Sequence, residues 1–275
     1  MIPKIIHYCW FGRNPLPELA IKCIASWKKY FPDYEIKEWN ETNYDVYKIA
    51  YTSEAYNAKK YAFVSDYARF DILYKYGGIY FDVDVEVIKP FNDILNNGGF
   101  MGFEYVGKLY NGAGIGCNSG LGMGCNSGHE IVSQILEFYS NIRFINIDGS
   151  YNLHTVVEYV TDILKKNGLK YENIIQPFNG ITIYPTEYFA PKSYITKELT
   201  ITKNTFSIHN YDGSWLPEYE RMYYVTRGKL CRIFGYRPGL IISFPLFVGT
   251  NIRNRGIRNG LKFVLNKIKN HNMKN

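Results

Sequence analysis

The first forty residues alternate short apolar runs with one helical segment. Residues 5–11 form the apolar run IIHYCWF, which Gly12 and the prolines after it end. Residues 17–30 then place apolar side chains at helical spacing, and residues 34–39 return to strict alternation. The pattern predicts the order strand, helix, strand. This order is typical of an α/β domain with a largely parallel sheet.

The rest of the chain continues the mixture of helices and strands. A longer helical segment precedes Gly77, and glycine commonly occupies the position just after the last helical residue. The spacing predicts helices at about 54–76, 129–140 and 152–167, and strands at 174–184 and 205–215. Residues 111–128 are rich in glycine but match no phosphate-binding loop, so we expect tight turns in which the backbone approaches a ligand or another strand.

One stretch stands out, because its polar positions are all acidic. Residues 76–90 read YGGIYFDVDVEVIKP, with apolar residues from Ile79 to Val87 and carboxylates at Asp82, Asp84 and Glu86. In a strand, alternate residues point to one face, so the three carboxylates would form a row and repel one another. We therefore expect positive charge beside the row.

The first two carboxylates suit a divalent cation. Their Cα atoms would lie about 6–7 Å apart on one strand face. Oxygen ligands of this kind favour Mg²⁺ or Mn²⁺, especially where a substrate diphosphate completes the coordination shell. A position at a strand end would place Asp82 and Asp84 in the crevice where open α/β sheets bind ligands. Glu86 has the simpler interpretation of a solvated or salt-bridged carboxylate.

The helical segment before Gly77 contributes a second charged pair. Asp66 and Arg69 are three residues apart and so share one helical face. They form either an ordinary surface ion pair or a site that reads sugar hydroxyl groups, because a carboxylate accepts and a guanidinium donates hydrogen bonds in fixed directions.

Composition and charge divide the chain into two parts. The 275 residues are 46% hydrophobic, enough for a large buried core, and the formal net charge is +7. Residues 216–275 hold 12 Lys and Arg against two Glu, so the positive charge belongs to the tail. We expect one domain at 1–215 and a basic amphipathic extension at 216–275. The extension either lies on an anionic membrane surface or packs as a solvated helix, and the lack of a recognition motif argues against nucleic acid.

Cysteine usage and the missing targeting signals indicate a cytoplasmic protein. The five cysteines are odd in number and form no CxxC pair, which argues against a disulfide framework and a zinc site. The first twelve residues lack the apolar core and cleavage site of a signal peptide. No apolar run reaches the 18 residues that a membrane span requires.

Four blocks in order carry a resemblance to a known family. The stretch SDYARFDILYKYGGIYFDVDV (65–85) resembles the signature of glycosyltransferase family 32, which has a DxD sugar-binding region and is distantly similar to the catalytic domains of clostridial glucosylating toxins. The opening IPKIIHYCWFG, IYPTEYFAP in the region 183–191 and SIHNYDGSW (207–215) agree as well. The resemblance covers about residues 1–215.

The resemblance implies a GT-A fold, an α/β nucleotide-sugar-binding domain with a mixed, mostly parallel central sheet, here with a basic helical C-terminal extension. It implies that Asp84 ligates the metal directly, Asp82 contacts the sugar and the metal's water shell, and His209 closes on the metal or diphosphate. It leaves Asn210 and Asp212 as rival metal ligands. The other implied donor-binding residues are Trp10 on the base, Ser65 near the nucleoside, Asp66 and Arg69 on the sugar, and Ser214 and Trp215 over the diphosphate.

The implied activity is transfer of a sugar from a nucleotide donor, with UDP favoured, to a hydroxyl of a glycan acceptor. The cofactor would be Mn²⁺ or Mg²⁺, and the anomeric configuration would be retained. Asn118 matches a polar position near the anomeric carbon and joins Asp82 and Asp84 as a candidate catalytic residue. A lipid-linked acceptor, as in bacterial capsular or lipopolysaccharide assembly, would give the basic extension a role at the inner face of the cell membrane.

Three alternatives remain at this point. In a phosphatase of the haloacid dehalogenase type Asp82 would be the nucleophile, but those enzymes place DxD on the first strand and about 80 residues precede it here. A non-catalytic carbohydrate-binding or calcium-binding module is the second, although no EF-hand loop is present. A catalytically inactive transferase is the third, and the intact set of Asp66, Arg69, Asp82 and Asp84 argues against it.

Overall fold

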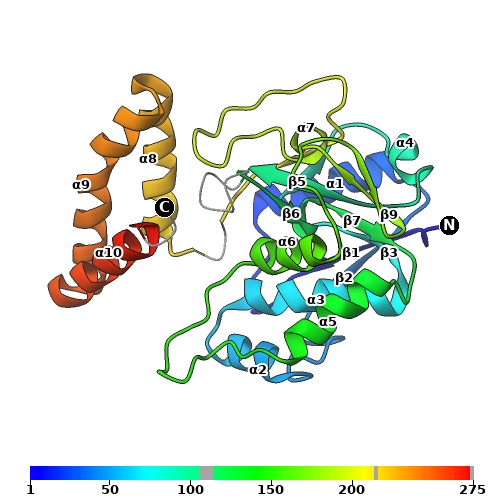
Figure 1. The fold of residues 1–275 in the computed structure, drawn as a ribbon, viewed down its shortest axis with the longest axis horizontal. Helices are drawn as coiled ribbons and strands as arrows, with labels where there is room; N and C mark the ends of the chain where they lie inside the picture. The colour runs from blue at the N-terminus through cyan, green and yellow to red at the C-terminus, as the bar shows by residue number, and fades with distance from the viewer. Residues whose placement is uncertain (106–113, 214–215, 273–275) are drawn as a thin grey trace. The chain divides into compact units, whose positions relative to one another are not determined.

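The computed structural model describes residues 1–105, 114–213 and 216–272 (Figure 1). The chain divides into two compact units. The first comprises Met1–Glu104, Ile115–Pro191 and Ile201–Asn210, and the second comprises the remaining segments with the C-terminal helices. The second unit includes Lys192–Thr200 as well as Tyr211–Asn275, so this division is not a single boundary in the sequence.

The first unit opens as the sequence predicts. Strand β1 (Ile5–Cys9), helix α1 (Glu18–Tyr30) and strand β2 (Glu35–Trp39) follow in order, and the two strands pair in parallel. Strand β3 (Gly78–Tyr80) pairs in parallel on the other side of β1. The sheet then continues through β7 (Met123–Cys125), β5 (Gly99–Tyr105), β9 (Ile181–Tyr184) and β8 (Gln176–Phe178), and β6 (Ile115–Asn118) pairs with β5.

The sheet is mixed, and the α/β class is confirmed. Parallel pairs occur at β2-β1-β3 and at β5-β9, whereas β3-β7, β5-β7 and β8-β9 are antiparallel. Antiparallel pairing thus has a larger share than a mostly parallel sheet would give. The cause is the glycine-rich segment, which returns as β7 beside β3 and reverses the strand direction there.

Helices pack on both faces of β1, because its side chains alternate. Ile6 and Tyr8 join the apolar cluster that α1 contributes to through Trp27. His7 points the other way and contacts Tyr76 at the end of α3 (Tyr61–Tyr76). Helix α5 (Glu130–Ser140) lies beside α3, and α6 (Val156–Lys166) packs against β6, as Figure 1 shows. The two short helices are α4 (Asn92–Leu95) and α7 (Thr186–Phe189).

Two predicted elements are split by their turn residues. The helix expected at 54–76 is two helices, α2 (Ala50–Asn57) and α3, because Lys59 adopts a left-handed backbone (φ 57°) that ends the first. The strand expected at 174–184 is the hairpin β8-β9, turned by Asn179 and Gly180 with φ of 41° and 82°. The helices expected at 129–140 and 152–167 are confirmed as α5 and α6, and the strand expected at 205–215 is the shorter β10 (Ser207–His209).

The acidic stretch is not one continuous strand, so that prediction is wrong. It forms β3 in the large sheet, a turn, and β4 (Val85–Val87), which pairs antiparallel with β10 in a separate two-stranded sheet. The turn is closed by the Val85 amide, which donates to the Asp82 carbonyl at 3.0 Å. Asp82 and Asp84 therefore sit where the chain leaves one sheet and enters another.

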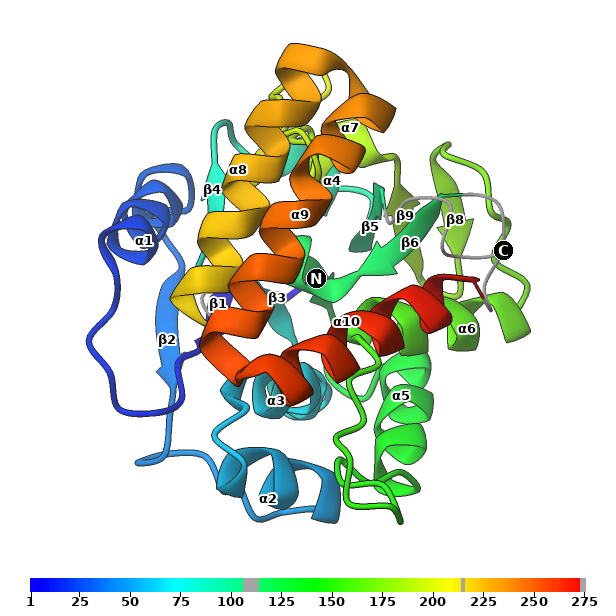
Figure 2. The same cartoon turned by 90° about the vertical axis from the view of Figure 1, so that its left-hand side faces the viewer.

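The second unit is dominated by three helices. They are α8 (Glu218–Phe234), α9 (Tyr236–Arg255) and α10 (Ile257–Asn272), and α9 packs against both of the others (Figure 2). Arg255 at the end of α9 pairs with Glu220 in the first turn of α8, at 2.5 Å, so α8 and α9 are antiparallel. In the part of the chain that the structure describes, no helix has the length and apolarity to cross a membrane.

Candidate functional site

Each carboxylate of the acidic stretch has a nitrogen partner from a different element. Asp82 Oδ1 lies 3.3 Å from Arg69 Nη2 on α3, and Asp84 Oδ1 lies 3.3 Å from His209 Nε2 on β10. Glu86 Oε2 lies 2.9 Å from Lys22 Nζ on α1. The expected positive charge beside the row is therefore present. Since the Glu86–Lys22 pair is largely exposed, we interpret it as a surface salt bridge and not as part of the site.

Arg69 is the centre of a buried network. Its Nη2 lies 2.8 Å from Asp66 Oδ1 as well as 3.3 Å from Asp82 Oδ1, and its Nε donates to the Ser65 carbonyl at 3.1 Å. Arg69 and Asp66 are both buried, so the interpretation as an ordinary surface pair is wrong. The hydroxyl of Tyr80 also donates to Asp82 Oδ1, at 2.9 Å, so this carboxylate oxygen is held by both Tyr80 and Arg69.

His209 lies between two carboxylates. Besides Asp84, its Nδ1 lies 3.7 Å from Oε2 of Glu104, and Glu104 accepts a hydrogen bond of 2.9 Å from Asn118 Nδ2. Strand pairing positions the imidazole, because His209 is directly opposite Val85, the residue after Asp84. Sequence reasoning missed Glu104. The available signal was a single acidic residue that ends the apolar run of β5 and is buried in the structure.

The backbone of the glycine-rich segment lies against Asp82, which is the kind of close backbone approach that we expect of this segment. The amide of Asp82 donates to the Gly120 carbonyl at 3.0 Å, and the Gly120 amide donates to Asn118 Oδ1 at 2.7 Å. A Cβ atom on Gly120 would lie 1.9 Å from Asp82 Oδ2. Only glycine therefore allows the backbone to approach the carboxylate this closely.

Burial and charge shift the acid–base behaviour of two of these groups. Burial raises the pKa of the Asp66 carboxyl to about 7, an effect that Arg69 opposes and Asp82 reinforces. Burial disfavours a charged His209, but the carboxylates of Asp84 and Glu104 outweigh it and raise the imidazole pKa to about 10. A cluster of buried, mutually perturbed groups is typical of a functional site.

The remaining predicted residues differ in what they contact. Trp10 follows β1, the neighbour of β3, and its Nε1 donates to the Asn14 carbonyl at 2.6 Å. The Ser65 hydroxyl bonds within α3 to the Tyr61 carbonyl. Asn210 holds the Asp84 carbonyl through its backbone and side-chain amides, at 3.0 and 3.1 Å. Asp212 belongs to the second unit, where it lies 3.8 Å from Arg221. Ser214 and Trp215 lie outside the described residues.

The residues fit a divalent cation that shares its shell with a ligand. Among residues 1–105, 114–213 and 216–272, no group of three or more His, Cys, Asp or Glu side chains is arranged to hold a metal by itself. Asp84 and His209 offer one carboxylate and one imidazole side by side. Mg²⁺ is commonly bound by one or two carboxylates together with substrate phosphates, so two protein ligands are compatible with this role.

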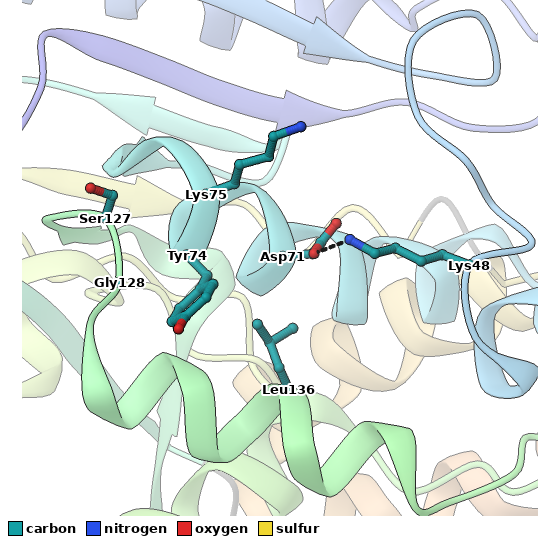
Figure 3. A pocket seen from close by; sticks show the side chains of 7 residues that line it. All are labelled: Lys48, Asp71, Tyr74, Lys75, Ser127, Gly128 and Leu136. Carbon is teal, nitrogen blue, oxygen red and sulfur yellow. Dashed lines mark hydrogen bonds and ion pairs between the residues drawn. The ribbon is translucent and has the colours of Figure 1, made fainter.

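A separate open pocket lies at the other end of β3. It has a volume of about 650 Å³ and is lined by residues from α3, from α5, from the segment after β7 and by Lys48. Figure 3 shows its ion pair between Lys48 and Asp71, which the structure places at 2.5 Å. The pocket begins where α3 ends, before β3, whereas Asp82 follows the end of β3. It does not contain any of the predicted site residues.

Comparison with known families and proteins supplies independent findings. Residues 17–100 match the model of a family described as a glycosyltransferase sugar-binding region containing a DXD motif. Inositol phosphoceramide mannosyltransferases 3 and 1 of Schizosaccharomyces pombe are 36% and 31% identical to this chain over 103 and 111 residues. These matches cover 34% and 36% of this chain and 28% and 33% of those proteins, so the similarity spans about a third of each.

A third relative matches over most of its length. The uncharacterized glycosyltransferase L373 of Acanthamoeba polyphaga mimivirus is 26% identical over 249 residues, which are 85% of this chain and 88% of that protein. Among solved structures, the PaToxG glycosyltransferase matches with a TM-score of 0.46 and 21% identity, over 60% of this chain and 69% of that one.

Proposed function

We propose that this chain, whose residues 17–100 match the glycosyltransferase sugar-binding region containing a DXD motif, is a metal-dependent enzyme that transfers a sugar from a nucleotide donor to a hydroxyl group. The observation that carries the proposal is the meeting of Asp84 with His209, 3.3 Å apart and beside the buried Asp66–Arg69–Asp82 network. In this proposal the short turn carries both a metal ligand, Asp84, and a carboxylate that meets the sugar, Asp82.

The proposed roles follow from the chemistry of the side chains. Asp84 and His209 would hold Mn²⁺ or Mg²⁺, which supplies stabilisation of the negative charge that develops on the diphosphate leaving group. Arg69 fixes the orientation of Asp66 and Asp82, so that their remaining lone pairs can accept hydrogen bonds from sugar hydroxyls. Trp10, Ser65, Ser214 and Trp215 stay proposals for the nucleotide and diphosphate contacts.

The network also bears on how the sugar is oriented. Asp82 is held by Arg69, Tyr80 and the Gly120 backbone, so a bound sugar meets a carboxylate whose position is already set. Such preorganisation lowers the cost of aligning the anomeric carbon for attack. We propose a retaining transfer by same-face attack, with Asn118 beside the reacting centre, because Asn118 bonds to both Glu104 and Gly120 at this edge.

The donor and acceptor are proposed by class. We favour a UDP-sugar, and the acceptor would be a glycan hydroxyl in bacterial capsular or lipopolysaccharide assembly. Because two relatives carry the name mannosyltransferase, GDP-mannose belongs in any donor screen. If the acceptor is lipid-linked, the enzyme would be cytoplasmic and peripheral to the membrane, with its basic extension on an anionic surface.

A screen of the purified protein against nucleotide sugars tests the proposal. Thermal shift and donor hydrolysis are measured with UDP- and GDP-sugars, each with Mn²⁺, with Mg²⁺ or with EDTA. We expect one donor to raise the melting temperature only with metal and to release its sugar slowly. Phosphate release from simple phosphoesters, with no response to any nucleotide sugar, would instead support the phosphatase alternative and make Asp82 the nucleophile. The engagement of Asp82 Oδ1 by Arg69 and Tyr80 disfavours that alternative.

A further inference from the structure

The C-terminal helices carry a one-sided charge distribution. From Arg221 to the last residue the chain has no Asp or Glu, while the 12 Lys and Arg of residues 216–275 all lie in that stretch. The two glutamates before it, Glu218 and Glu220, are in the first turn of α8. All acidic charge of the helical hairpin α8-α9 is therefore at the end where α8 begins and α9 finishes.

The opposite end of this hairpin is an exposed apolar tip between two arginines. Residues 232–238, which join α8 to α9, are all exposed and read RIFGYRP. The side chains of Ile233, Phe234 and Tyr236 expose 71%, 53% and 51% of their surface. Arg232 and Arg237 flank them. Burying such large apolar groups is normally favourable, so a cluster of three on a turn indicates a surface that is covered in use.

The tip is held rigidly by the two helices that carry it. Gly239 lies against Cys231, so closely that a Cβ on Gly239 would be 2.4 Å from the Cys231 Cα. The Cys231 thiol donates to the Tyr236 carbonyl at 3.6 Å across the turn. The three apolar side chains therefore project from a fixed support. The exposed apolar surface continues along α9 through Ile241 and Phe244, which are three residues apart on one helical face.

We infer that the α8-α9 tip, residues 232–238, inserts into the interface of an anionic lipid bilayer. Ile233 and Phe234 enter the apolar layer, Tyr236 takes the interfacial position that amphipathic rings favour, and Arg232 and Arg237 pair with lipid phosphates. This inference deepens the proposed function and rests on its membrane-linked acceptor, since it names the segment and the lipid class that hold the enzyme at its substrate.

The combination of groups favours a bilayer over other acidic partners. A nucleic acid backbone would pair with the arginines but would leave Ile233 and Phe234 in water, because phosphates and sugars offer no apolar layer. A second copy of the tip would bring arginines against arginines, and residues 221–275 contain no Asp or Glu to compensate. A bilayer containing anionic lipid satisfies both the charge and the apolar surface at once.

Vesicle co-sedimentation of the full chain tests the inference without any sugar donor or metal, so its outcome is independent of the transferase proposal. The vesicles are either pure phosphatidylcholine or a mixture with phosphatidylglycerol, whose headgroups give the surface a negative potential. We expect partitioning onto the mixed vesicles only. The double variant Ile233→Ser/Phe234→Ser should lower the partition coefficient by about tenfold or more, because several buried CH₂ groups are lost.

Control variants distinguish vesicle binding by the tip from non-specific adsorption of exposed apolar or basic side chains. Ile147→Ser removes a still more exposed isoleucine from the first unit, and Lys28→Gln/Lys29→Gln removes two exposed cations from α1. Both should bind vesicles as the unaltered protein does, whereas Arg232→Gln/Arg237→Gln should bind less and lose salt dependence. Circular dichroism melting checks that each variant folds.

Four results would overturn the inference. The first is absence of binding to mixed vesicles, and the second is equal binding by the tip variants. The third is a change in oligomeric mass, measured by light scattering, when the tip is altered, which would make the tip a contact between copies. Retention of a short nucleic acid in place of vesicles would likewise assign the tip to a different partner.

Discussion

Nε2 of His209 lies 3.3 Å from Oδ1 of Asp84, and strand pairing, not chance proximity, holds the two side chains together. His209 is opposite Val85 in the β4-β10 ladder, and both amide groups of Asn210 hold the Asp84 carbonyl. The backbone therefore sets the distance between a carboxylate and an imidazole that are far apart in the sequence. The proposed metal position depends on this ladder.

Replacing Asp84 should abolish metal-dependent turnover and leave the fold intact. Asp84→Asn removes a negative ligand, and we expect a fall of about 100-fold or more in kcat/KM with weaker Mn²⁺ binding. Calorimetric titration of Mn²⁺ with nucleotide present, together with donor hydrolysis, measures both. Glu86→Gln is the matched control, because Glu86 belongs to the same acidic stretch but pairs with the exposed Lys22. Full activity of Asp84→Asn at saturating Mn²⁺ would exclude the ligand role.

Glu104 should act through His209. A histidine that binds a metal usually donates its second N–H to a carboxylate, and the Glu104 carboxylate lies 3.7 Å from Nδ1. Glu104→Gln keeps the size of the side chain and an oxygen for Asn118, yet we expect Mn²⁺ affinity to drop by about 10- to 100-fold. Nucleotide binding in EDTA should not change. If Mn²⁺ binds the variant with unaltered affinity, Glu104 has no part in positioning the imidazole.

Arg69 should be necessary for stability as well as for activity. Arg69→Lys cannot span Asp66, Asp82 and the Ser65 carbonyl at once, because an ammonium lacks the planar fork of a guanidinium. Removing the partner of a buried carboxylate such as Asp66 costs about 3–5 kcal/mol, and because lysine keeps the positive charge, urea unfolding should show a loss below this range. Lys22→Ala, which removes the exposed partner of Glu86, should cost about 1 kcal/mol or less. Similar losses for the two variants would contradict a buried network.

Gly120 should tolerate no side chain. Gly120→Ala would place a methyl group 1.9 Å from Asp82 Oδ2, so the carboxylate or the glycine-rich segment must move. We expect donor hydrolysis to fall by about 100-fold, the size of effect that misplacement of a reacting group produces. Gly249→Ala is the control, because nothing lies within 4 Å of its Cβ position and it is helical. Wild-type turnover by Gly120→Ala would show that Asp82 need not hold its position.

His7 should make the protein less stable in mild acid. Its Nε2 lies 2.9 Å from the Gly77 carbonyl and its Nδ1 accepts from Trp39 at 3.1 Å, so the ring is neutral with the proton on Nε2. Burial lowers the His7 pKa to about 4 from 6.5, an effect that the Gly77 bond opposes and Lys37 reinforces. Since the unfolded chain binds the proton first, stability is complete above pH 6.5 and falls toward pH 4, by at most about 1.4 kcal/mol per pH unit.

Comparison with His7→Gln isolates this effect. The raised pKa of Asp66 gives a slope of opposite sign, because the folded protein keeps that proton between pH 3.8 and about 7 and loses stability as pH rises. Both proteins contain Asp66, so the difference between their unfolding free energies reports His7 alone. Urea titrations from pH 4 to 8 should show this difference shrinking as the solution becomes more acidic. A difference that is independent of pH would mean that His7 has the same pKa in the folded and the unfolded chain.

Local patterns predicted the parts of the fold that local physics determines. The opening β1-α1-β2 order, Gly77 as the end of α3 and the helices α5 and α6 follow from apolar spacing and turn residues. The hairpin in 174–184 was readable too, because Asn179-Gly180 is a strong hairpin signal. The break at Lys59 was not readable, since lysine has no intrinsic preference for the left-handed region that it adopts.

The sequence predicted that positive charge lies beside the acidic residues, but not which residues supply that charge. The row of carboxylates required positive charge nearby, and repulsion alone made that inference safe. Which residues supply it depends on tertiary pairing. Lys22 comes from α1 and His209 from β10, and no local pattern connects either to the acidic turn. Glu104 was missed for the same reason, because its meaning appears only when β5 and β10 are brought together.

The acidic turn joins two separate sheets, which limits how the domain can be divided. The family-matched stretch, residues 17–100, contains Asp82 and Asp84 but neither β10 nor the glycine-rich segment. Grafted into another protein, that stretch would bring a motif without the imidazole, the Gly120 carbonyl or the strand that orients Asp84. Chimeras should therefore exchange the motif together with residues 115–125 and 205–210, and truncations should keep all three segments. The groups that hold Asp82 and Asp84 in place lie partly outside the motif.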